Sequence, residues 1–409
     1  MFSMNPFLLR EVKILKRCIS TMKSLSPQLD FEYICDPVNS EEIKSRIKRR
    51  KGEGDVDLVR KLYSDLSSTG DPSIRQRLIK EALKIPNKSH PRLLGLKDEP
   101  EVIKTIGDIK QTNFKPKTFE ELARKLKLIR TDTSCFTGSR SYYLIDQLAQ
   151  LELALVNYSV SKLKRLGFEF ISVPDILPKH IIEYCGFNTE GERTQVYKLE
   201  NLGDDLCLSG TAEMGIAAYL QNKEFSSDEL PIKLAAVSRC FRAETSRISE
   251  EKGLYRVHQF TKVEMFGVAT CEGSAQLLEE FREYEEETFA ELGLVLRVLD
   301  MPECELGAQA YRKYDVEAFM PGKKKWGEIS STSNCTDYQA RRLNIKYDGQ
   351  FAHTINGTAC AVPRMIIALM ETHQNKNGTV EMPKQLVPYL GSSTIGMSSL
   401  PKIKLSKGI

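Results

Sequence analysis

The sequence lacks the cysteine and histidine spacings that hold a structural metal. Its ten cysteines occur singly, with no C-x-x-C pair, and its five histidines form no H-x-x-x-H pair. We therefore expect no zinc site, and we expect most cysteines to be reduced and buried, as in an intracellular protein. No apolar run approaches the roughly 18 residues that a membrane-spanning helix needs, so no membrane partner is expected.

Familiar nucleotide-binding signatures are also missing. The chain has no G-x-x-x-x-G-K-[ST] loop, and Gly52 and Gly54 lack the third glycine and the preceding strand of a dinucleotide fold. The formal net charge of +4 over 409 residues is small, so a polyanion partner would need a local basic patch. A hydrophobic fraction of 41% and a charged fraction of 28% are ordinary for a globular protein with a sizeable core.

Acidic residues are nearly absent from residues 1–29. Five bases, Arg10, Lys13, Lys16, Arg17 and Lys23, face one acid, Glu11, and aliphatic residues lie between the bases. This basic, amphipathic composition predicts a mitochondrial transit segment and therefore a location in the mitochondrial matrix. The alternative interpretation is an ordinary basic N-terminal helix.

The rest of the chain changes character near residue 116. Residues 30–115 predict a helical domain, with helices at 41–51, 55–66 and 73–83 and a charged linker at 96–115. Residues 116–409 predict an α+β domain, an antiparallel sheet flanked by helices, because short alternating runs follow one another with few helical crossovers. The small-residue stretch before residue 362 reads as irregular, and residues 402–407 form a basic tail.

A polar hairpin between residues 239 and 266 carries the chemistry. By strand alternation, Arg242 could bind a phosphate, Phe260 could stack on a base and Glu264 could accept hydrogen bonds. We expect His258 to support the hairpin rather than to act as a base. The alternative interpretation is an exposed, salt-bridged hairpin.

Five spaced segments carry a family resemblance. They are Gly167-Phe168 through Val173-Pro174, Thr211-Ala212-Glu213, Phe241-Arg242-x-Glu244 with Gly253 through Glu264, Glu328-Ile329-Ser330-Ser331-x-Ser333-Asn334, and Asn356-Gly357-Thr358-Ala359 through Pro363-Arg364. In this order they resemble motif 1, the serine-binding loop, motif 2, the E-I-S-S-x-S-N stretch and motif 3 of seryl-type class II aminoacyl-tRNA synthetases. The resemblance covers about residues 118–392, and phrases such as GTAEMG and SNCTDYQARRL look closest to the animal mitochondrial branch.

The resemblance implies roles for individual residues. Arg242 would contact the α-phosphate of ATP and Arg364 the γ-phosphate, while Glu328 and Ser331 would hold Mg²⁺. Phe260 and Arg364 would enclose adenine. The implied ATP-binding set is Arg242, Glu244, Phe260, Glu328, Ile329, Ser330, Ser331 and Arg364. The implied serine-binding set is Thr211, Ala212, Glu213, Arg242, Glu264 and Thr358; the alternative role of Thr211 is to cap a helix.

The implied activity is activation of L-serine with ATP to seryl-adenylate, followed by transfer of serine to the 3′-terminal adenosine of tRNA-Ser by a homodimer. One rival is a catalytically reduced paralogue that binds RNA or protein; the second is another adenylate-forming enzyme that does not use tRNA. Retention of Arg242, Glu264, Glu328 and Arg364 argues against the first rival. The T-A-E loop and the serine-type motif 2 argue against the second.

The helical domain departs from the family. Seryl-type enzymes usually carry a long coiled-coil arm that contacts tRNA, but here only residues 68–73 separate two helices of about three turns. The arm is therefore expected to be a stub, and tRNA would need other contacts. Six bases within one helix are the densest candidate, namely Lys44, Arg46, Lys48, Arg49, Arg50 and Lys51; the alternative is a solvated helix face.

Overall fold

The computed structural model describes residues 26–96, 98–131, 138, 140–191, 194–199, 205–244 and 253–400. The predicted transit segment, apart from residues 26–29, lies outside these residues, and so does the basic tail with Lys402, Lys404 and Lys407.

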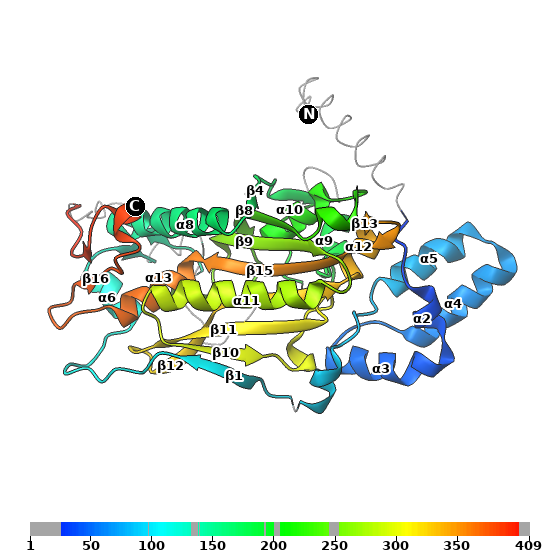
Figure 1. The fold of residues 1–409 in the computed structure, drawn as a ribbon, viewed down its shortest axis with the longest axis horizontal. Helices are drawn as coiled ribbons and strands as arrows, with labels where there is room; N and C mark the ends of the chain where they lie inside the picture. The colour runs from blue at the N-terminus through cyan, green and yellow to red at the C-terminus, as the bar shows by residue number, and fades with distance from the viewer. Residues whose placement is uncertain are drawn as a thin grey trace, which may run out of the picture.

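An eight-stranded sheet forms the centre of the molecule (Figure 1). Its strands, in spatial order, are β1 (Glu101–Ile106), β10 (Leu296–Asp300), β11 (Arg312–Met320), β12 (Lys325–Thr336), β15 (His353–Ala361), β9 (Gln259–Ala269), β8 (Ile232–Phe241) and β4 (Glu169–Phe170). All neighbours are antiparallel except β4 and β8. The predicted α+β class is confirmed.

One face of this sheet packs against three long helices. They are α8 (Gln147–Arg165), α11 (Ser274–Glu291) and α13 (Val362–Thr372), and Figure 1 shows α11 running along the sheet. Leu151, Phe281 and Ile366 from these helices share one core with Val263 and Val316 from the strands. Apolar residues recur on α8 and α11 at helical spacing, so each helix buries one side against the sheet.

The opposite face is covered only in part. Three short helices, α9 (Lys179–Tyr184), α10 (Ala212–Tyr219) and α12 (Tyr338–Leu343), pack there on Phe266 and Val268 of β9. Because successive strand residues point to opposite faces, Phe260, Lys262 and Glu264 lie on this same side. The polar residues singled out in the sequence therefore share the face that α8, α11 and α13 leave free.

Within the described residues, four α-helices precede the sheet. They are α2 (Phe31–Cys35), α3 (Ser40–Arg49), α4 (Val56–Thr69) and α5 (Pro72–Ala82), and they project beyond one end of the sheet (Figure 1). Asp55 and Asp71 cap α4 and α5 with their side chains, and Gly70 ends α4 in the left-handed conformation. The α4–α5 hairpin is thus 14 and 11 residues long, which confirms that the arm is short.

The remaining elements are short. The helices are α6 (Phe119–Lys125) and α14 (Val387–Leu390); the strands are β2 (Ile129–Arg130), β3 (Tyr143–Leu144), β5 (Ile176–Pro178), β6 (Leu206–Leu208), β7 (Glu224–Phe225), β13 (Lys346–Tyr347), β14 (Gln350–Phe351), β16 (Val380–Glu381) and β17 (Thr394–Ile395).

Two sequence predictions were wrong. Residues 101–106, predicted as linker, form the edge strand β1, whose Glu101 pairs with Asp300 of β10. The small-residue stretch predicted to be irregular is β15, a central strand paired with β12 and β9. Glycine and asparagine, which lie in the middle of this stretch, are poor strand formers on intrinsic preference, and tertiary pairing overrides that preference here.

Candidate active site

The hairpin of β8 and β9 sets the first part of the site. Its register places Cys240 opposite Phe260 and Ala236 opposite Glu264. Directly after β8, the Arg242 N–H donates to the His258 carbonyl at 2.9 Å. The His258 Nδ1 atom lies 3.0 Å from the Arg242 carbonyl oxygen and 2.9 Å from the Tyr197 hydroxyl. His258 thus supports the hairpin, as predicted.

Arg242 connects this hairpin to the loop before α10. Its guanidinium lies 5.3 Å from the centre of the Phe260 ring, and its Nε donates to the Gly210 carbonyl at 3.4 Å. Gly210 immediately precedes Thr211, so two of the resembling segments meet at one arginine. Glu244, two residues further, is buried; its Oε2 lies 3.5 Å from Arg256 Nη1 but forms no hydrogen bond among the described residues.

Arg364 and Glu328 form the second part of the site. Arg364 lies in the first turn of α13. Its Nη1 is 3.1 Å from the Glu328 carbonyl oxygen and 3.2 Å from Glu328 Oε1. The guanidinium also lies 4.6 Å from the centre of the Tyr255 ring. In the described structure, therefore, Tyr255 is the aromatic neighbour of Arg364, whereas Phe260 has Arg242 over it.

The charges around Glu328 keep it ionised. Desolvation alone would raise the pKa of this carboxyl, but Arg364, Lys313 and Arg242 together hold that pKa well below its usual range. The side chain retains 38% exposure, so the carboxylate can still reach a ligand. On the neighbouring strand, Asp315 lies opposite Ser331 and forms an ion pair with Lys313 at 2.8 Å. Burial raises the pKa of Asp315.

These groups provide oxygen donors of the kind that Mg²⁺ prefers. The candidate ligands are the Glu328 carboxylate and the Ser331 hydroxyl on β12. Within the described ranges no group of three or more histidine, cysteine, aspartate or glutamate residues is arranged to hold a metal ion by itself. Two protein ligands fit an ion that arrives with phosphate oxygens as its other ligands.

Glu264 forms the third part of the site. It is 2% exposed and ion-paired with Lys262, and Thr358 lies directly opposite it in the β15–β9 register. Burial raises the pKa of Glu264, while Lys262, Arg242 and the Thr211 hydroxyl act to lower it. The Thr211 side chain also accepts from the Glu213 N–H at 3.3 Å and caps α10. The capping role considered for Thr211 is therefore present.

Glu213 is engaged by the protein. Its Oε1 accepts hydrogen bonds from Gln339 Nε2 at 2.6 Å and from Asn356 Nδ2 at 2.8 Å. Burial, followed by the nearby charge of Glu264, raises the pKa of Glu213 to about 7. Gln339 and Asn356 thus hold the Glu213 carboxyl close to Glu264, and its contact with serine stays a prediction.

Three further members of the predicted sets are buried. Ala212 and Ile329 are 1% and 0% exposed, so their side chains belong to the core and only their backbone is near the site. The Ser330 hydroxyl donates to the Thr358 carbonyl at 2.5 Å and so ties β12 to β15. The structure therefore brings Arg242, Phe260 and Glu264 together with the Glu328–Arg364 pair, while these three residues support them.

Sequence reasoning missed three residues at the site. The first is Tyr255, which lies in a 3₁₀ turn and whose hydroxyl donates to the Glu328 carbonyl at 3.3 Å. Lys313 and Asp315 were not considered. The alternation of charged and apolar residues along β11 was a usable signal, because Lys313 and Asp315 alternate with Tyr314 and Val316.

The predicted basic tRNA-binding helix is largely used for packing. Arg46 is 2% exposed and bonded to the Tyr33 hydroxyl at 2.7 Å. Arg50 donates to the carbonyls of Gly307, Ala310 and Lys88 and to the Ser89 hydroxyl. Desolvation of this guanidinium lowers its pKa to about 10. Both guanidiniums make protein contacts in this structure, and the expectation that they bind tRNA stays a prediction.

The other members of this helix differ in exposure. Lys44 pairs with Glu41 and Asp57, and Arg49 lies 3.3 Å from Glu303. Lys48 and Lys51 are exposed beside a groove of about 660 Å³. Only these two remain as freely presented cations of the predicted cluster.

Comparison with known proteins shows which class of protein this chain resembles in sequence and fold. Residues 197–373 match the family model described as tRNA synthetase class II core domain (G, H, P, S and T). The fold superimposes on the seryl-tRNA synthetase from Pyrococcus horikoshii complexed with ATP with a TM-score of 0.80 and 29% identity, covering 91% of this chain and 100% of that one. The fold is thus that of a class II aminoacyl-tRNA synthetase.

Sequence relatives narrow the class. A serine–tRNA ligase from Rubrobacter xylanophilus is 44% identical over 79% of this chain and 78% of its own length. A mitochondrial serine–tRNA ligase from Mus musculus is 44% identical over 80% of this chain and 65% of its own length, so the chain spans about two thirds of that relative. The chain belongs to the seryl-tRNA synthetase family.

None of the helices in the described part of the chain is long and apolar enough to cross a membrane.

Proposed function

We propose that this protein activates L-serine with ATP and transfers it to the 3′-terminal adenosine of tRNA-Ser. The observation that carries the proposal is the convergence of Arg242, Phe260 and Glu264 from one hairpin with the Glu328–Arg364 pair on the free face of the sheet. The relatives named serine–tRNA ligase support the choice of substrate.

The first step needs charge stabilisation and positioning. A carboxylate oxygen of serine attacks the α-phosphorus of ATP, and the bond to pyrophosphate breaks with its electron pair leaving on pyrophosphate. Negative charge grows on the α-phosphate oxygens, and the guanidinium of Arg242 stabilises it. Arg364, held in place by Glu328 and Tyr255, binds the departing phosphates. Phe260 would support the adenine ring from one side, and Glu244 would accept a hydrogen bond from its amino group.

Serine selection falls to Glu264 and Thr358. They lie opposite each other on β9 and β15 and are both buried, so a serine hydroxyl between them would complete their hydrogen bonding. An amino acid without the hydroxyl would leave these buried groups unpaired, which disfavours it strongly. Glu213, fixed by Gln339 and Asn356, holds the N-terminal end of α10 against this pocket.

A bound Mg²⁺ would neutralise phosphate charge and orient the triphosphate. The ionised carboxylate of Glu328 and the hydroxyl of Ser331 are the residues proposed to hold it.

The second step transfers the acyl group. The terminal ribose hydroxyl of tRNA attacks the carbonyl carbon of the adenylate, and AMP leaves with the electron pair of the broken bond. No side chain needs to act as a strong base for the proposed chemistry, which agrees with the structural role of His258.

Assembly and location are part of the proposal. Leu153, Phe170 and Ile176 are large exposed apolar side chains at the β4 end of the sheet, near the segment that resembles motif 1, and they suit the interface of a homodimer. The basic segment 1–29 would direct the protein to the mitochondrial matrix. A reporter fused to residues 1–29 should enter mitochondria; a reporter with Arg10, Lys13, Lys16 and Arg17 changed to Gln should stay in the cytosol.

We propose a smaller basic surface for tRNA than the sequence predicted. Lys48 and Lys51 would neutralise backbone phosphates beside the groove on α3. The double variant Lys48→Gln, Lys51→Gln should bind tRNA more weakly and with a flatter salt dependence. Lys61→Gln, an exposed lysine on α4, is the matched control. An unchanged salt slope in the double variant would remove the assignment.

Charging of tRNA tests the complete proposal. Purified protein with ATP, serine and mitochondrial tRNA-Ser should form seryl-tRNA, and a tRNA truncated by its terminal adenosine should not be charged. Failure to charge any tRNA-Ser by protein that still makes seryl-adenylate would separate the second step from the first and refute the transfer.

A further inference from the structure

A cavity of about 280 Å³ lies outside the candidate active site, between the N-terminal helices and the sheet domain. It is formed where α2 and α3, the segment after α5, and α12 meet, at the end of the sheet to which the helices attach (Figure 1). Its lining residues with charged or aromatic side chains are Asp30, Tyr33, Arg46, Lys88, Tyr311, Asp337, Tyr338, Arg341, Arg342 and His353.

Arg342 is the unusual member of this lining. It is 5% exposed, its Nη1 donates to the Tyr338 carbonyl at 2.8 Å, and its guanidinium stacks on the Tyr338 ring at 3.3 Å from the centre. Its Nε has no hydrogen-bond partner, and no carboxylate of the described residues forms an ion pair with it. An arginine stays protonated even when buried, so this positive charge has no carboxylate in ion-pair contact among the described residues, although Asp337 lies near enough to act on it.

The carboxylates nearby are already used. Asp337 accepts from Arg341 Nε at 2.6 Å, and Asp30 lies 3.8 Å from the same arginine. Glu42, outside the cavity, pairs with Arg46. These carboxylates therefore form their ion pairs with Arg341 and Arg46 and form none with Arg342.

The rim adds a second unpaired cation. Lys88 is exposed at the entrance, with its amine 3.8 Å from the centre of the Tyr33 ring and no ion pair among the described residues. The His353 ring faces the cavity from β15, its Nδ1 is 2.8 Å from the Ser274 hydroxyl, and burial lowers its pKa, so it adds a polar group without a charge. The cavity therefore has an excess of positive charge in a partly enclosed, polar space.

We propose that this cavity binds a small phosphate-type anion, either inorganic phosphate or the phosphate group of a mononucleotide. Arg342 would supply a charge-assisted hydrogen bond through its free Nε, and Lys88 would close the rim as a second cation. The volume exceeds that of one phosphate group, and tyrosine rings line it, so a small organic group attached to the phosphate also fits.

Such a ligand would join two parts of the protein. The cavity is lined by α2 and α3 on one side and by α12 on the other. Gln339, also on α12, donates a hydrogen bond to Glu213. A bound anion would therefore stabilise the contact between the helical domain and the helix that supports the proposed serine pocket.

Calorimetric titration of the full chain with inorganic phosphate, and separately with AMP, tests the proposal. Both titrations use an Arg364→Ala background, because the proposed ATP site also attracts phosphate. We expect saturable binding there, weakened tenfold or more by Arg342→Gln and severalfold by Lys88→Gln, as expected for loss of one charged contact. Lys61→Gln, which removes an exposed charge elsewhere in the helical domain, should leave it unchanged.

The two probes distinguish the sources of the anion. Binding of both assigns the site to phosphate itself, and binding of AMP alone assigns it to a mononucleotide. Lys88 is exposed, so its variant should fold even if Arg342→Gln does not. No binding of either probe in the Arg364→Ala background, or equal binding in Lys88→Gln and Lys61→Gln, would overturn the proposal.

Discussion

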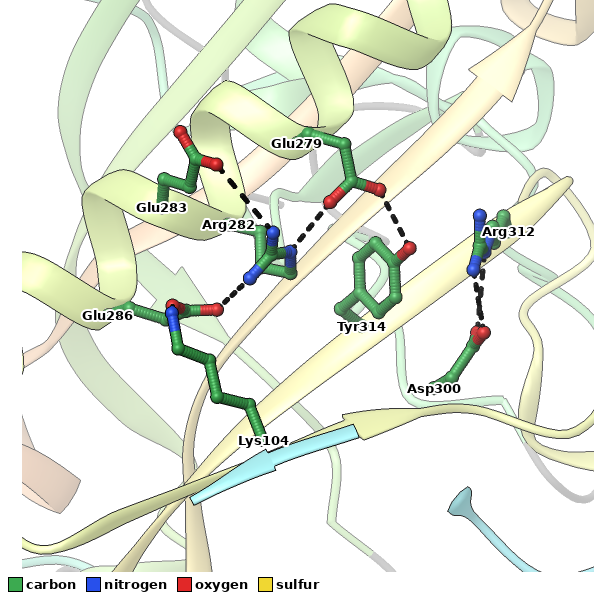
Figure 2. Close-up of polar contacts among 8 residues, drawn as sticks. All are labelled: Lys104, Glu279, Arg282, Glu283, Glu286, Asp300, Arg312 and Tyr314. Atoms are coloured by element: carbon green, nitrogen blue, oxygen red, sulfur yellow. Dashed lines mark hydrogen bonds and ion pairs between the residues drawn. The ribbon is translucent and has the colours of Figure 1, made fainter. Parts of the chain in front are cut away.

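Strand β11 lies between two clusters of charged residues, which differ in how many of their polar groups have partners within the protein. Successive residues of β11 point to opposite faces of the sheet. Arg312 and Tyr314 face α11, whereas Lys313 and Asp315, which alternate with them, face the candidate active site. Figure 2 shows the α11 cluster: Arg282 contacts Glu279, Glu283 and Glu286, the Tyr314 hydroxyl donates to Glu279 at 2.7 Å, and Arg312 pairs with Asp300 at 2.7 Å. Lys104 of β1 reaches Glu286 at 2.5 Å and so attaches the edge strand to α11.

In the cluster on the active-site face, some buried polar groups lack hydrogen-bond partners. Glu244 Oε2 and Glu264 Oε2 are buried and form no hydrogen bond among the described residues; each has an ion-pair contact instead, with Arg256 and Lys262 respectively. Among the described residues, the Arg242 guanidinium makes a long contact to the Gly210 carbonyl and lies over the Phe260 ring. Closed networks of satisfied charges stabilise a fold, whereas buried polar groups that lack partners mark a place for a ligand. The comparison therefore separates a structural cluster from the candidate catalytic one on a single strand.

The largest expected effect is loss of adenylation on the active-site face. Arg242→Ala and Arg364→Ala should each reduce serine-dependent ATP–pyrophosphate exchange by roughly a hundredfold or more, the scale of one preorganised charge contact. Arg282→Ala, the matched arginine on the other face, should retain an exchange rate close to that of the wild type. Near-normal exchange in both active-site variants would remove the phosphate assignments.

The next effect concerns selectivity. Glu264→Ala should raise the Michaelis constant for serine roughly tenfold to a hundredfold, because one hydrogen bond to a charged group is lost, and should change the constant for ATP much less. Steady-state exchange with each substrate varied in turn measures both constants. If the constant for ATP rose and that for serine did not, Glu264 would not belong to the serine pocket.

The α11 cluster should affect stability. Arg282→Ala leaves Glu286, which is 3% exposed, with only Lys104 as a partner, and should lower the free energy of unfolding by about 2 kcal/mol. Lys84→Ala, which breaks the more exposed pair with Glu81, should cost about 0.5 kcal/mol. Urea unfolding of the three proteins measures the difference. Equal stability of Arg282→Ala and Lys84→Ala would show that the α11 cluster does not stabilise the fold more than a surface ion pair does.

The smallest effect is a pH dependence of stability from Glu213. The pKa of Glu213 in the folded protein is raised to about 7. The stability that the protonated side chain contributes is therefore fully present below the pKa of the unfolded state and is lost as the pH rises through about 7. Between about pH 6 and about pH 7 the wild type should lose about 1 kcal/mol more than Glu213→Gln. Parallel slopes for the two proteins would mean that Glu213 is not buried as a neutral acid.

The sequence could predict the long helices and the motif-bearing hairpin, because apolar spacing and a dense series of family-like residues are local signals. It could not predict β1, whose residues are almost all exposed and which is a strand only because β10 lies beside it. The basic run on α3 looked like a solvated face. Arg50 instead enters the sheet domain, and its partner carbonyls are more than 200 residues away at Gly307 and Ala310.

Within the site the limits were similar. Arg242 and Glu264 were predictable from strand alternation and from the resemblance, and their roles remain predictions. The position of Tyr255 against Arg364 was not, since it depends on a 3₁₀ turn packing against the start of α13. The support of Glu213 by Gln339 and Asn356 joins three separate segments, and no local pattern reveals it.

Serine-dependent ATP–pyrophosphate exchange by the purified protein is the most direct test that the incomplete cluster is an adenylation site. We predict exchange with serine, and far less with alanine, which lacks the hydroxyl, in the absence of any tRNA. Folded protein that binds neither ATP nor serine and catalyses no exchange would contradict the account.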